Sequence, residues 1–258
     1  ELASAPCSLL GETAQTFWRA LRERRVGDVR LVYAEMDDGM VFKAPYEKWR
    51  SASGAAWPFK DEFEIGCTLE HAGYYTTWLT AFFGPAESVT AFSSCLYPDK
   101  ITSNEHDAAD FSVACIRFHS GVVARLTCSI VAPHDQRLRA FGTEGLLYTD
   151  FSWNYRQPVK TRRMLNIRRR QLFTPWSRRL LLADAGVAHP RGRHAMHFCR
   201  GPAAVAAAIR DGRRSPLPID FCLHNNEIVL AIQNATEHSQ TVVLSTSFAP
   251  LQPQPWAR

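Results

Sequence analysis

Residues 66–97 read GCTLEHAGYYTTWLTAFFGPAESVTAFSSCLY, and a change of period inside this stretch decides the fold. Residues Gly66 to Phe83 predict a helix, which ends at Gly84-Pro85. From Glu87 to Tyr97 the period becomes two, which is typical of a half-buried strand. The stretch therefore predicts a helix that leads directly into a strand.

Further strand candidates follow along the chain. They cover residues 111–119, 122–131, 136–141 and 146–150. Two short connections of hairpin type lie among them, His119-Ser120-Gly121 and Thr143-Glu144-Gly145. Consecutive strands on short turns predict an antiparallel meander, and residues 158–173 predict one or two more strands at its edge.

The flanking segments add helices and one long irregular region. On the N-terminal side the pattern predicts a strand end at 2–6, a helix at 12–24 and a strand at 29–36. Residues 41–64 have no clear period, and a loop of this length is usually functional. The C-terminal part predicts helices at 202–211 and 221–236 and a short strand at 242–247.

Strands in succession, flanked by helices, predict the α+β class: an open, mostly antiparallel sheet with helices packed on one face. The 258 residues are enough to bury a proper core, and we find no internal repeat and no linker between independent domains. No run of about 18 apolar residues is present, so we expect no membrane span.

Cysteine usage and the start of the chain suggest a cytoplasmic protein that is part of something longer. The seven cysteines form no CxxC pair and no zinc-type spacing, which favours a reduced compartment and no metal. No secretory leader is recognisable. The chain begins with Glu1 rather than Met, so we expect that the gene product starts upstream or is processed.

The net charge of +5 is concentrated in one arginine-rich segment, residues 162–179. Such a segment can bind nucleic acid or another anionic surface, and binding would then fall steeply with salt. No known nucleic-acid motif surrounds it, so a solvated sheet edge is the preferred interpretation and no nucleic-acid partner is expected.

Three stretches share motifs with a known family. The first runs from Cys7 to Leu31 and contains the turn Val26-Gly27-Asp28-Val29. The second joins Gly66-Cys67-Thr68-Leu69-Glu70 to Gly84-Pro85-Ala86-Glu87-Ser88-Val89. The third joins Arg200-Gly201-Pro202 to His224-Asn225-Asn226-Glu227. Together they resemble the C-terminal domain of the Gfo/Idh/MocA (glucose-fructose oxidoreductase, inositol dehydrogenase) family, which implies a dihydrodipicolinate-reductase-like C-terminal fold.

The resemblance implies a nicotinamide-dependent oxidoreductase that acts on a sugar, a polyol or a related hydroxy compound. Family members carry an N-terminal Rossmann domain with a glycine-rich phosphate turn, and a Glu-Lys-Pro segment whose Lys serves catalysis. This sequence contains neither motif, so we expect NAD or NADP to bind only with a missing N-terminal domain. Residues 1–10 would then be the last strand and exit of that domain, and residues 11–258 the substrate-binding and oligomerisation domain.

The family places an Asp and a His four residues apart on one helical face to exchange a proton with the substrate hydroxyl. Aligned without gaps, those positions fall on Glu70 and Tyr74. His71 is the neighbouring imidazole, offset about 100° around the helix. The predicted catalytic residues are thus Glu70, His71 and Tyr74, and the predicted substrate-binding residues are Trp57, Lys60 and Cys67. For four of them a structural role is the alternative: a surface or capping pair for Glu70 and His71, a solvated loop for Lys60 and a packed core for Cys67.

Two functions remain open on this evidence. The first is the substrate domain of an oxidoreductase. It would bind a small sugar or polyol and would be inactive without its Rossmann domain. The second is a non-catalytic sugar-binding or assembly protein derived from the same family, which the altered Asp/His pair favours. In both cases the open sheet predicts a homo-oligomer through its bare face.

Overall fold

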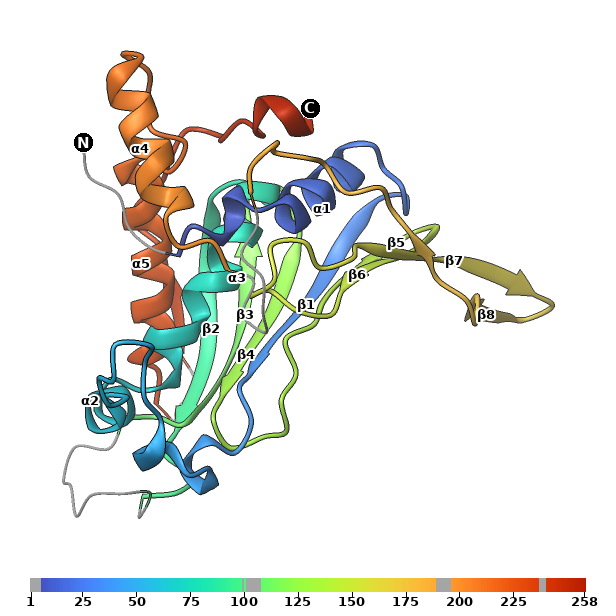
Figure 1. Ribbon diagram of the computed structural model, residues 1–258. Coiled ribbons are helices and arrows are strands. Elements are labelled where there is room, and N and C mark those ends of the chain that lie inside the picture. The colour runs from blue at the N-terminus through green and yellow to red at the C-terminus, as the bar shows by residue number, and fades with distance from the viewer. Residues whose placement is uncertain (1–5, 99, 101–107, 189–195, 237–239) are drawn as a thin grey trace.

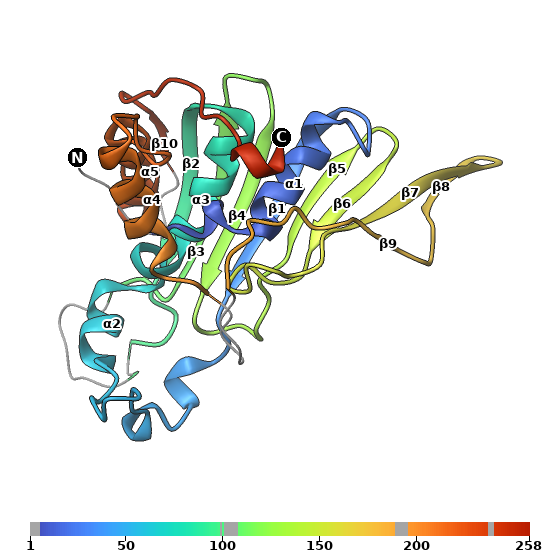
Figure 2. The ribbon, with the colours of Figure 1, turned by 45° about the horizontal axis from the view of Figure 1, so that its top comes forward.

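Helices lie on one side of an open sheet. The computed structural model describes residues 6–98, 100, 108–188, 196–236 and 240–258. The described helices are α1 (Glu12–Arg22), α2 (Phe59–Ile65), α3 (Cys67–Phe83), α4 (Arg200–Arg210) and α5 (Ile219–Gln233). The strands are β1 (Val29–Asp37), β2 (Ala86–Ser94), β3 (Phe111–Phe118), β4 (Val123–Ser129), β5 (Leu138–Gly142), β6 (Gly145–Thr149), β7 (Lys160–Ile167), β8 (Arg170–Phe173), β9 (Arg178–Arg179) and β10 (Gln240–Val243). Helices α1, α3 and α5 cover one face (Figures 1 and 2), which confirms the predicted α+β class.

The sheet departs from a simple meander at one strand. Its order is β10-β2-β3-β4-β1-β5-β6-β7-β8, with β9 paired to β7. Strand β1 lies between β4 and β5 and runs parallel to β4, while the other pairs are antiparallel. Residues 130–137 therefore do not form a hairpin: they pass the end of β1, where the backbones of Asp37 and Asp135 exchange hydrogen bonds of 2.9 Å. The predicted meander is therefore wrong between β4 and β5, because β1 lies between them. The turn residues in the sequence do not show that a distant strand is inserted there.

Helix α3 is the centre of the core and fixes the position of its own first turn. Tyr75, Trp78 and Leu79 are at most 1% exposed. The Tyr75 hydroxyl donates to the carbonyl of Gln136, and the indole Nε1 of Trp78 donates to Ser8 Oγ at 2.9 Å. Because buried polar groups of this kind are costly to leave unpaired, these bonds lock α3 against neighbours on both sides.

Several predicted boundaries change. Residues 41–64 are not a plain loop: they contain 3-10 turns at Val41–Lys43 and Tyr46–Lys48 and most of α2, because Phe59 and Phe63 recur at helical spacing and pack on the core. The last helix begins two residues early, at Ile219 after Pro218, which suits a first helical turn. The last strand is β10 rather than 242–247. The strand end predicted at 2–6 lies outside the described residues except for Pro6.

The arginine-rich segment forms the far edge of the sheet. Strands β7 and β8 extend as a ribbon beyond the rest of the molecule (Figures 1 and 2), and β9 pairs at its base. Its tip is largely exposed, including Ile167 and Leu172. The edge strands predicted for residues 158–173 are thereby confirmed.

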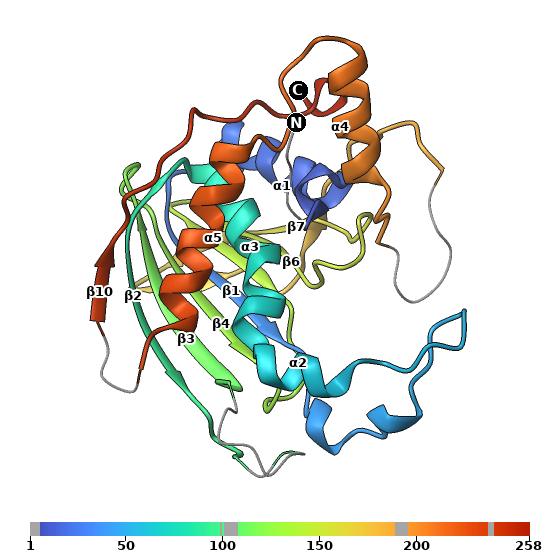
Figure 3. The same cartoon turned by 90° about the vertical axis from the view of Figure 1, so that its left-hand side faces the viewer.

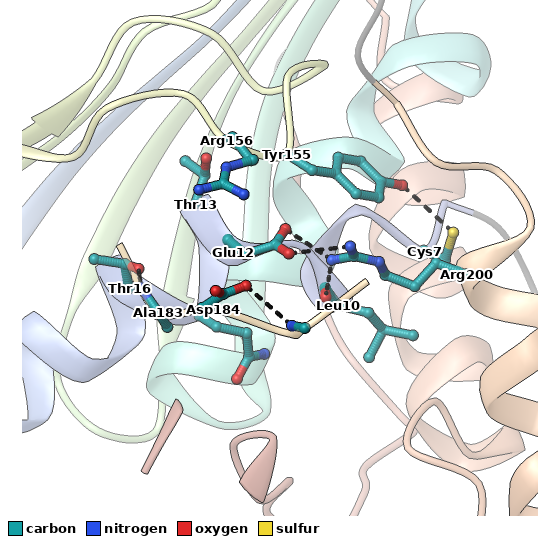
Figure 4. A network of polar contacts seen from close by, with 12 residues as sticks. Cys7, Leu10, Glu12, Thr13, Thr16, Tyr155, Arg156, Ala183, Asp184 and Arg200 are labelled. Carbon is teal, nitrogen blue, oxygen red and sulfur yellow. Dashed lines mark hydrogen bonds and ion pairs between the residues drawn. The ribbon is translucent and has the colours of Figure 1, made fainter. Parts of the chain in front are cut away.

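A buried ion pair ties α4 to the start of α1 (Figure 4). Arg200 donates to both carboxylate oxygens of Glu12, at 2.9 and 3.1 Å, and to the carbonyl of Leu10 at 2.9 Å. The Glu12 side chain is fully buried, and the guanidinium lies over the Tyr155 ring at 5.4 Å. This link holds α4, which contacts the sheet little, against the helical layer.

The turn that leads into β1 depends on a glycine. Gly27 has φ +76°, and a Cβ there would lie 2.2 Å from Thr143 Oγ1, which accepts the backbone N–H of Asp28 at 3.0 Å. Gly27→Ala should therefore lower the free energy of unfolding by about 1–3 kcal/mol, measured by urea denaturation. Gly54→Ala is the matched control, because Gly54 has φ +85° and open space around it. Equal losses in the two variants would show that the Thr143 contact contributes nothing.

Candidate functional site

A cavity of about 620 Å³ lies at the N-terminal end of α3. Five segments surround it: the residue after β1, the 41–65 region with α2, the first turn of α3, the loop after β4 and the loop after β6. Figure 3 shows α2 and the chain before it extending past the end of the sheet, next to α3. The lining residues are Asp38, Val41, Trp49, Trp57, Glu62, Phe63, Glu70, His71, Ile130, His134, Phe151 and Trp153.

Gly66 sets the direction in which α3 enters the cavity. Its φ of +89° allows α2 to end and α3 to begin without an intervening loop, and a Cβ there would lie 2.7 Å from Ala108. The Glu70 N–H donates to the Gly66 carbonyl at 3.3 Å, which closes the first turn. Glu70 and His71 are therefore held in a fixed position by the turn and by the buried body of α3.

Three carboxyl groups meet in the cavity, one from each of three segments. Burial, together with the nearby Glu62 and Asp38, raises the pKa of Glu70 to about 9. Glu62 also shares a hydrogen bond with the Glu70 carboxyl. Burial raises the pKa of Asp38 to about 6, although His134 opposes this shift. Glu70 is thus neutral at pH 7 and holds a proton that it can give to a bound molecule.

His71 is buried without a hydrogen bond in this cavity. Its side chain is 3% exposed, and Nε2 lies 3.7 Å from Glu70 Oε1 and 3.9 Å from Asp38 Oδ2, both beyond hydrogen-bonding distance. Nδ1 has no partner among the described residues. Burial lowers the pKa of His71 to about 4, so the imidazole is neutral at pH 7. A buried imidazole with this geometry is available to a ligand that enters between the two carboxyl groups.

Aromatic rings form two groups in the wall of the cavity. Trp49 and Trp57 pack with centroids 5.0 Å apart, and Trp57 meets Phe63 edge-on at 6.0 Å. In the second group, Trp153 packs on His71 at 5.8 Å and on Phe151 at 5.9 Å. Aromatic faces of this kind pack against the C–H faces of sugar rings, while the carboxyl groups bind hydroxyls.

Tyr74 faces a second cavity. It packs on Trp153 at 5.7 Å, but it lines a neighbouring, mainly apolar cavity of about 640 Å³ together with Cys7 and Tyr155. Burial and the nearby Glu70 raise the pKa of Tyr74 to about 12, so its hydroxyl stays protonated at neutral pH and can donate a hydrogen bond. Trp153 separates Tyr74 from the first cavity, so Glu70 and His71 lie together and Tyr74 lies behind that ring.

The predicted substrate-binding residues are placed differently from one another. Trp57 lines the first cavity. Lys60 is exposed on α2 and lines neither of these two cavities. Cys67 is buried, with Sγ 3.5 Å from the Ala109 carbonyl and 3.6 Å from the Cys128 carbonyl, and burial raises its pKa to about 12. Lys60 and Cys67 are therefore not part of the site that we propose below.

Among the lining residues that the sequence does not predict, four matter most for the chemistry of the cavity: Asp38, Glu62, His134 and Trp153. Asp38 lies in an Asp-Asp-Gly sequence directly after the strand predicted at 29–36, and this turn is the signal that could have indicated it. His134 lies between two predicted strands, where a lone histidine indicates no function. The four residues come from separate segments, and only the tertiary fold brings them together.

The described residues do not form a site that fits a nicotinamide dinucleotide. The first turns of α1 and α5 carry Glu12 and Asp220, whose charge is unfavourable for a pyrophosphate, and Glu70 in the first turn of α3 lies close to Asp38 and Glu62. Helix α4 begins at Arg200, whose guanidinium is already bound to Glu12. Within the described ranges there is also no group of three His, Cys, Asp or Glu side chains that could hold a metal ion.

Comparison with known proteins places the fold in one family. Residues 14–148 match the family model described as the GFO/IDH/MocA C-terminal domain. The aldose-aldose oxidoreductase from Caulobacter crescentus, complexed with glycerol, is 17% identical with a TM-score of 0.67, and the match covers 95% of this chain and 64% of that one. The WlbA dehydrogenase from Bordetella pertussis, in complex with NADH and UDP-GlcNAcA, is 17% identical with a TM-score of 0.57, covering 91% and 61%.

A further structure, the UDP-N-acetylglucosamine 3-dehydrogenase GnnA from Acidithiobacillus ferrooxidans, is 17% identical with a TM-score of 0.54, covering 92% of this chain and 62% of that one. This chain therefore spans less than two thirds of the length of these structures. No curated protein matches the sequence significantly. None of the described helices is both long and apolar enough to cross a membrane.

Proposed function

Because this chain belongs to the GFO/IDH/MocA C-terminal domain family, we propose that it is the substrate-binding and assembly domain of an NAD(P)-dependent oxidoreductase. Its substrate is a sugar, a polyol or a related hydroxy compound. The observation that carries this proposal is the cavity at α3, where a proton-bearing carboxyl group, a neutral imidazole and aromatic walls surround a space of about 620 Å³. A space of this size suits one small polyhydroxy molecule.

Each residue of the site has a distinct role in this proposal. Glu70 exchanges a proton with the reacting oxygen: it donates when a carbonyl is reduced, and it accepts as a carboxylate when a hydroxyl is oxidised. His71 binds an adjacent hydroxyl. Trp57 packs against the ring or chain of the substrate. Tyr74 contributes to the site indirectly, by packing on Trp153, and its hydroxyl can donate a hydrogen bond to a group in the second cavity.

The dinucleotide is bound by a separate domain in this proposal, since the described residues do not fit it. When bound, NAD or NADP supplies or accepts the hydride. Residues 1–10 would connect to that domain, and residues 11–258 bind substrate and assemble. The WlbA dehydrogenase, which shares this fold, contains NADH in its structure.

Assembly would use the face of the sheet opposite the helices. There Glu35 binds Arg125 and Arg139, and the two guanidiniums lie 4.1 and 5.7 Å from the Tyr33 ring centroid. Successive strand residues alternate between faces, so Val32 and Ala34 point to the core while Tyr33 and Glu35 point away. A second copy of the chain would cover this face. All seven cysteines are free thiols, which fits the cytoplasmic location that we propose.

Cofactor titration tests the proposal. NADH and NADPH should bind weakly or not at all to the 258-residue chain, and tightly to a longer version that includes the sequence preceding it in its gene, as measured by calorimetry and nicotinamide fluorescence. Tight binding by the 258-residue chain would contradict the assignment of the cofactor to another domain. Absence of binding to both versions would favour the alternative, a non-catalytic sugar-binding or assembly protein.

A further inference from the structure

Carboxyl groups outnumber possible cations among the described residues that line the α3 cavity. Among the described lining residues are three carboxyl groups, Asp38, Glu62 and Glu70, and two imidazoles, but neither Lys nor Arg. Burial keeps the His71 imidazole neutral at pH 7. No cation appears among the groups that shift the pKa of Glu70. A ligand that enters the cavity therefore meets a negative field, which penalises phosphates and carboxylates and favours a positive charge.

The surroundings of His71 show where that charge would lie. Its Nε2 lies 3.7 Å from Glu70 Oε1 and 3.9 Å from Asp38 Oδ2, and neither contact is a hydrogen bond. A primary ammonium group has three N–H donors and no acceptor, so it can donate to both carboxylates and to a neutral imidazole nitrogen at once.

The aromatic walls are consistent with the same ligand. Trp49 and Trp57 pack on each other in the wall of the cavity, and Trp153 packs on His71. Tryptophan rings attract cations through their faces and also pack on the apolar faces of sugar rings. A hydroxyl group could form hydrogen bonds with the same side chains, but it carries no positive charge and would not be attracted by the carboxylates.

We propose that the cavity selects an amine-bearing sugar or polyol, whose ammonium group is bound between Asp38, Glu70 and His71, and that it excludes anionic sugars. This inference rests on the proposed function and specifies its substrate class.

Binding of the ammonium group should be accompanied by proton release. Glu70 faces Glu62 on α2, Asp38 after β1, and His71 on its own helix, with His134 next to Asp38. Burial and those carboxyl groups keep Glu70 protonated near neutral pH, with a pKa of about 9. An ammonium group beside it stabilises the carboxylate, so the proton leaves when the ligand binds.

The test compares matched ligands that differ in one group. Binding of glucose, glucosamine and glucuronate, of sorbitol and 1-amino-1-deoxysorbitol, and of inositol and its monoamino derivative is measured by calorimetry on the 258-residue chain at pH 7.5. We expect at least one amine to bind about tenfold or more tightly than its hydroxyl counterpart. Repeating the titration in buffers of different ionisation enthalpy should reveal the released proton, and glucuronate should bind least.

Asp38→Asn should weaken binding of the amine about tenfold or more beyond any loss that it causes for the hydroxyl counterpart, because only the amine loses a charge–charge attraction. Asp61→Asn is the matched control, because Asp61 is exposed on α2 and does not line the cavity. Equal affinity for amine and hydroxyl ligands would overturn this inference and leave the proposed function standing. Tighter binding of glucuronate would overturn it in the same way, and absence of binding by every ligand would overturn both.

Discussion

Replacing Glu70 by glutamine should lower the turnover number of the assembled oxidoreductase by about 10²–10⁴-fold. Glutamine keeps the shape of the side chain and a hydrogen bond to the substrate, but it has no proton to exchange with the reacting oxygen. Because the other groups of the cavity remain, KM should change much less than kcat. The measurement is steady-state kinetics on a version of the protein that carries its dinucleotide-binding domain.

The pH dependence of the reaction rates would identify Glu70 as the group that exchanges a proton with the substrate. With an uncharged sugar or polyol as the substrate, the Glu70 pKa of about 9 means that the carboxylate needed for hydroxyl oxidation is scarce at pH 7, so the oxidation rate should rise about tenfold per pH unit towards pH 9. Carbonyl reduction uses the protonated form, so its rate should be level below pH 9 and fall above it. Glu62→Gln removes one of the charges that raise the pKa of Glu70, and both profiles should move to lower pH.

Glu64→Gln is the control for Glu70→Gln, because Glu64 is exposed on α2 and does not line the cavity. Its turnover and pH profile should match those of the unchanged protein. If Glu70→Gln kept the pH profile of the unchanged protein, another group would carry the proton, and Tyr74→Phe would be the next variant to measure.

The sequence predicts local parts of this molecule well, because local patterns determine them. Helix α3 lies between two glycines with φ of +89° and +84°, and each of them ends the helical pattern at the residue expected. The alternation after Gly84 predicts β2 for a similar reason. The position of β1 between β4 and β5 depends on contacts between distant segments, and no turn motif encodes it.

The contrast between local patterns and contacts of distant segments also explains which site residues the sequence predicts and which it misses. Glu70 and His71 are adjacent on α3, and both line the cavity because it surrounds the first turn of the helix instead of facing one side of it. Residues four apart lie on the same face of a helix, so this spacing alone predicts that Glu70 and Tyr74 share a site. The structure places Tyr74 behind Trp153, a residue that follows β6 far along the chain. Asp38 and His134 reach the cavity only because β1 and β4 run parallel, so that both strands end beside α3.

Replacing Arg200 by methionine should lower the free energy of unfolding by about 3–5 kcal/mol at neutral pH, measured by urea denaturation. Methionine fills most of the volume of the arginine side chain, but it leaves the fully buried Glu12 without its two charged hydrogen bonds (Figure 4). The carbonyl of Leu10 loses a donor in the same variant. Most of the loss therefore comes from a carboxylate kept out of water, and only a smaller part from the contacts of Arg200 itself.

Two further variants separate these contributions. Arg210→Met removes an ion pair on the same helix, with Asp211 at 2.8 Å, but the Arg210 side chain is 76% exposed and no measurable change is expected. The double variant Glu12→Gln with Arg200→Met should be more stable than Arg200→Met alone, because the buried charge is then absent. If Arg200→Met were as stable as Arg210→Met, water would reach Glu12 once the guanidinium is gone. The pair would then position α4 beside the Tyr74 cavity without stabilising the fold.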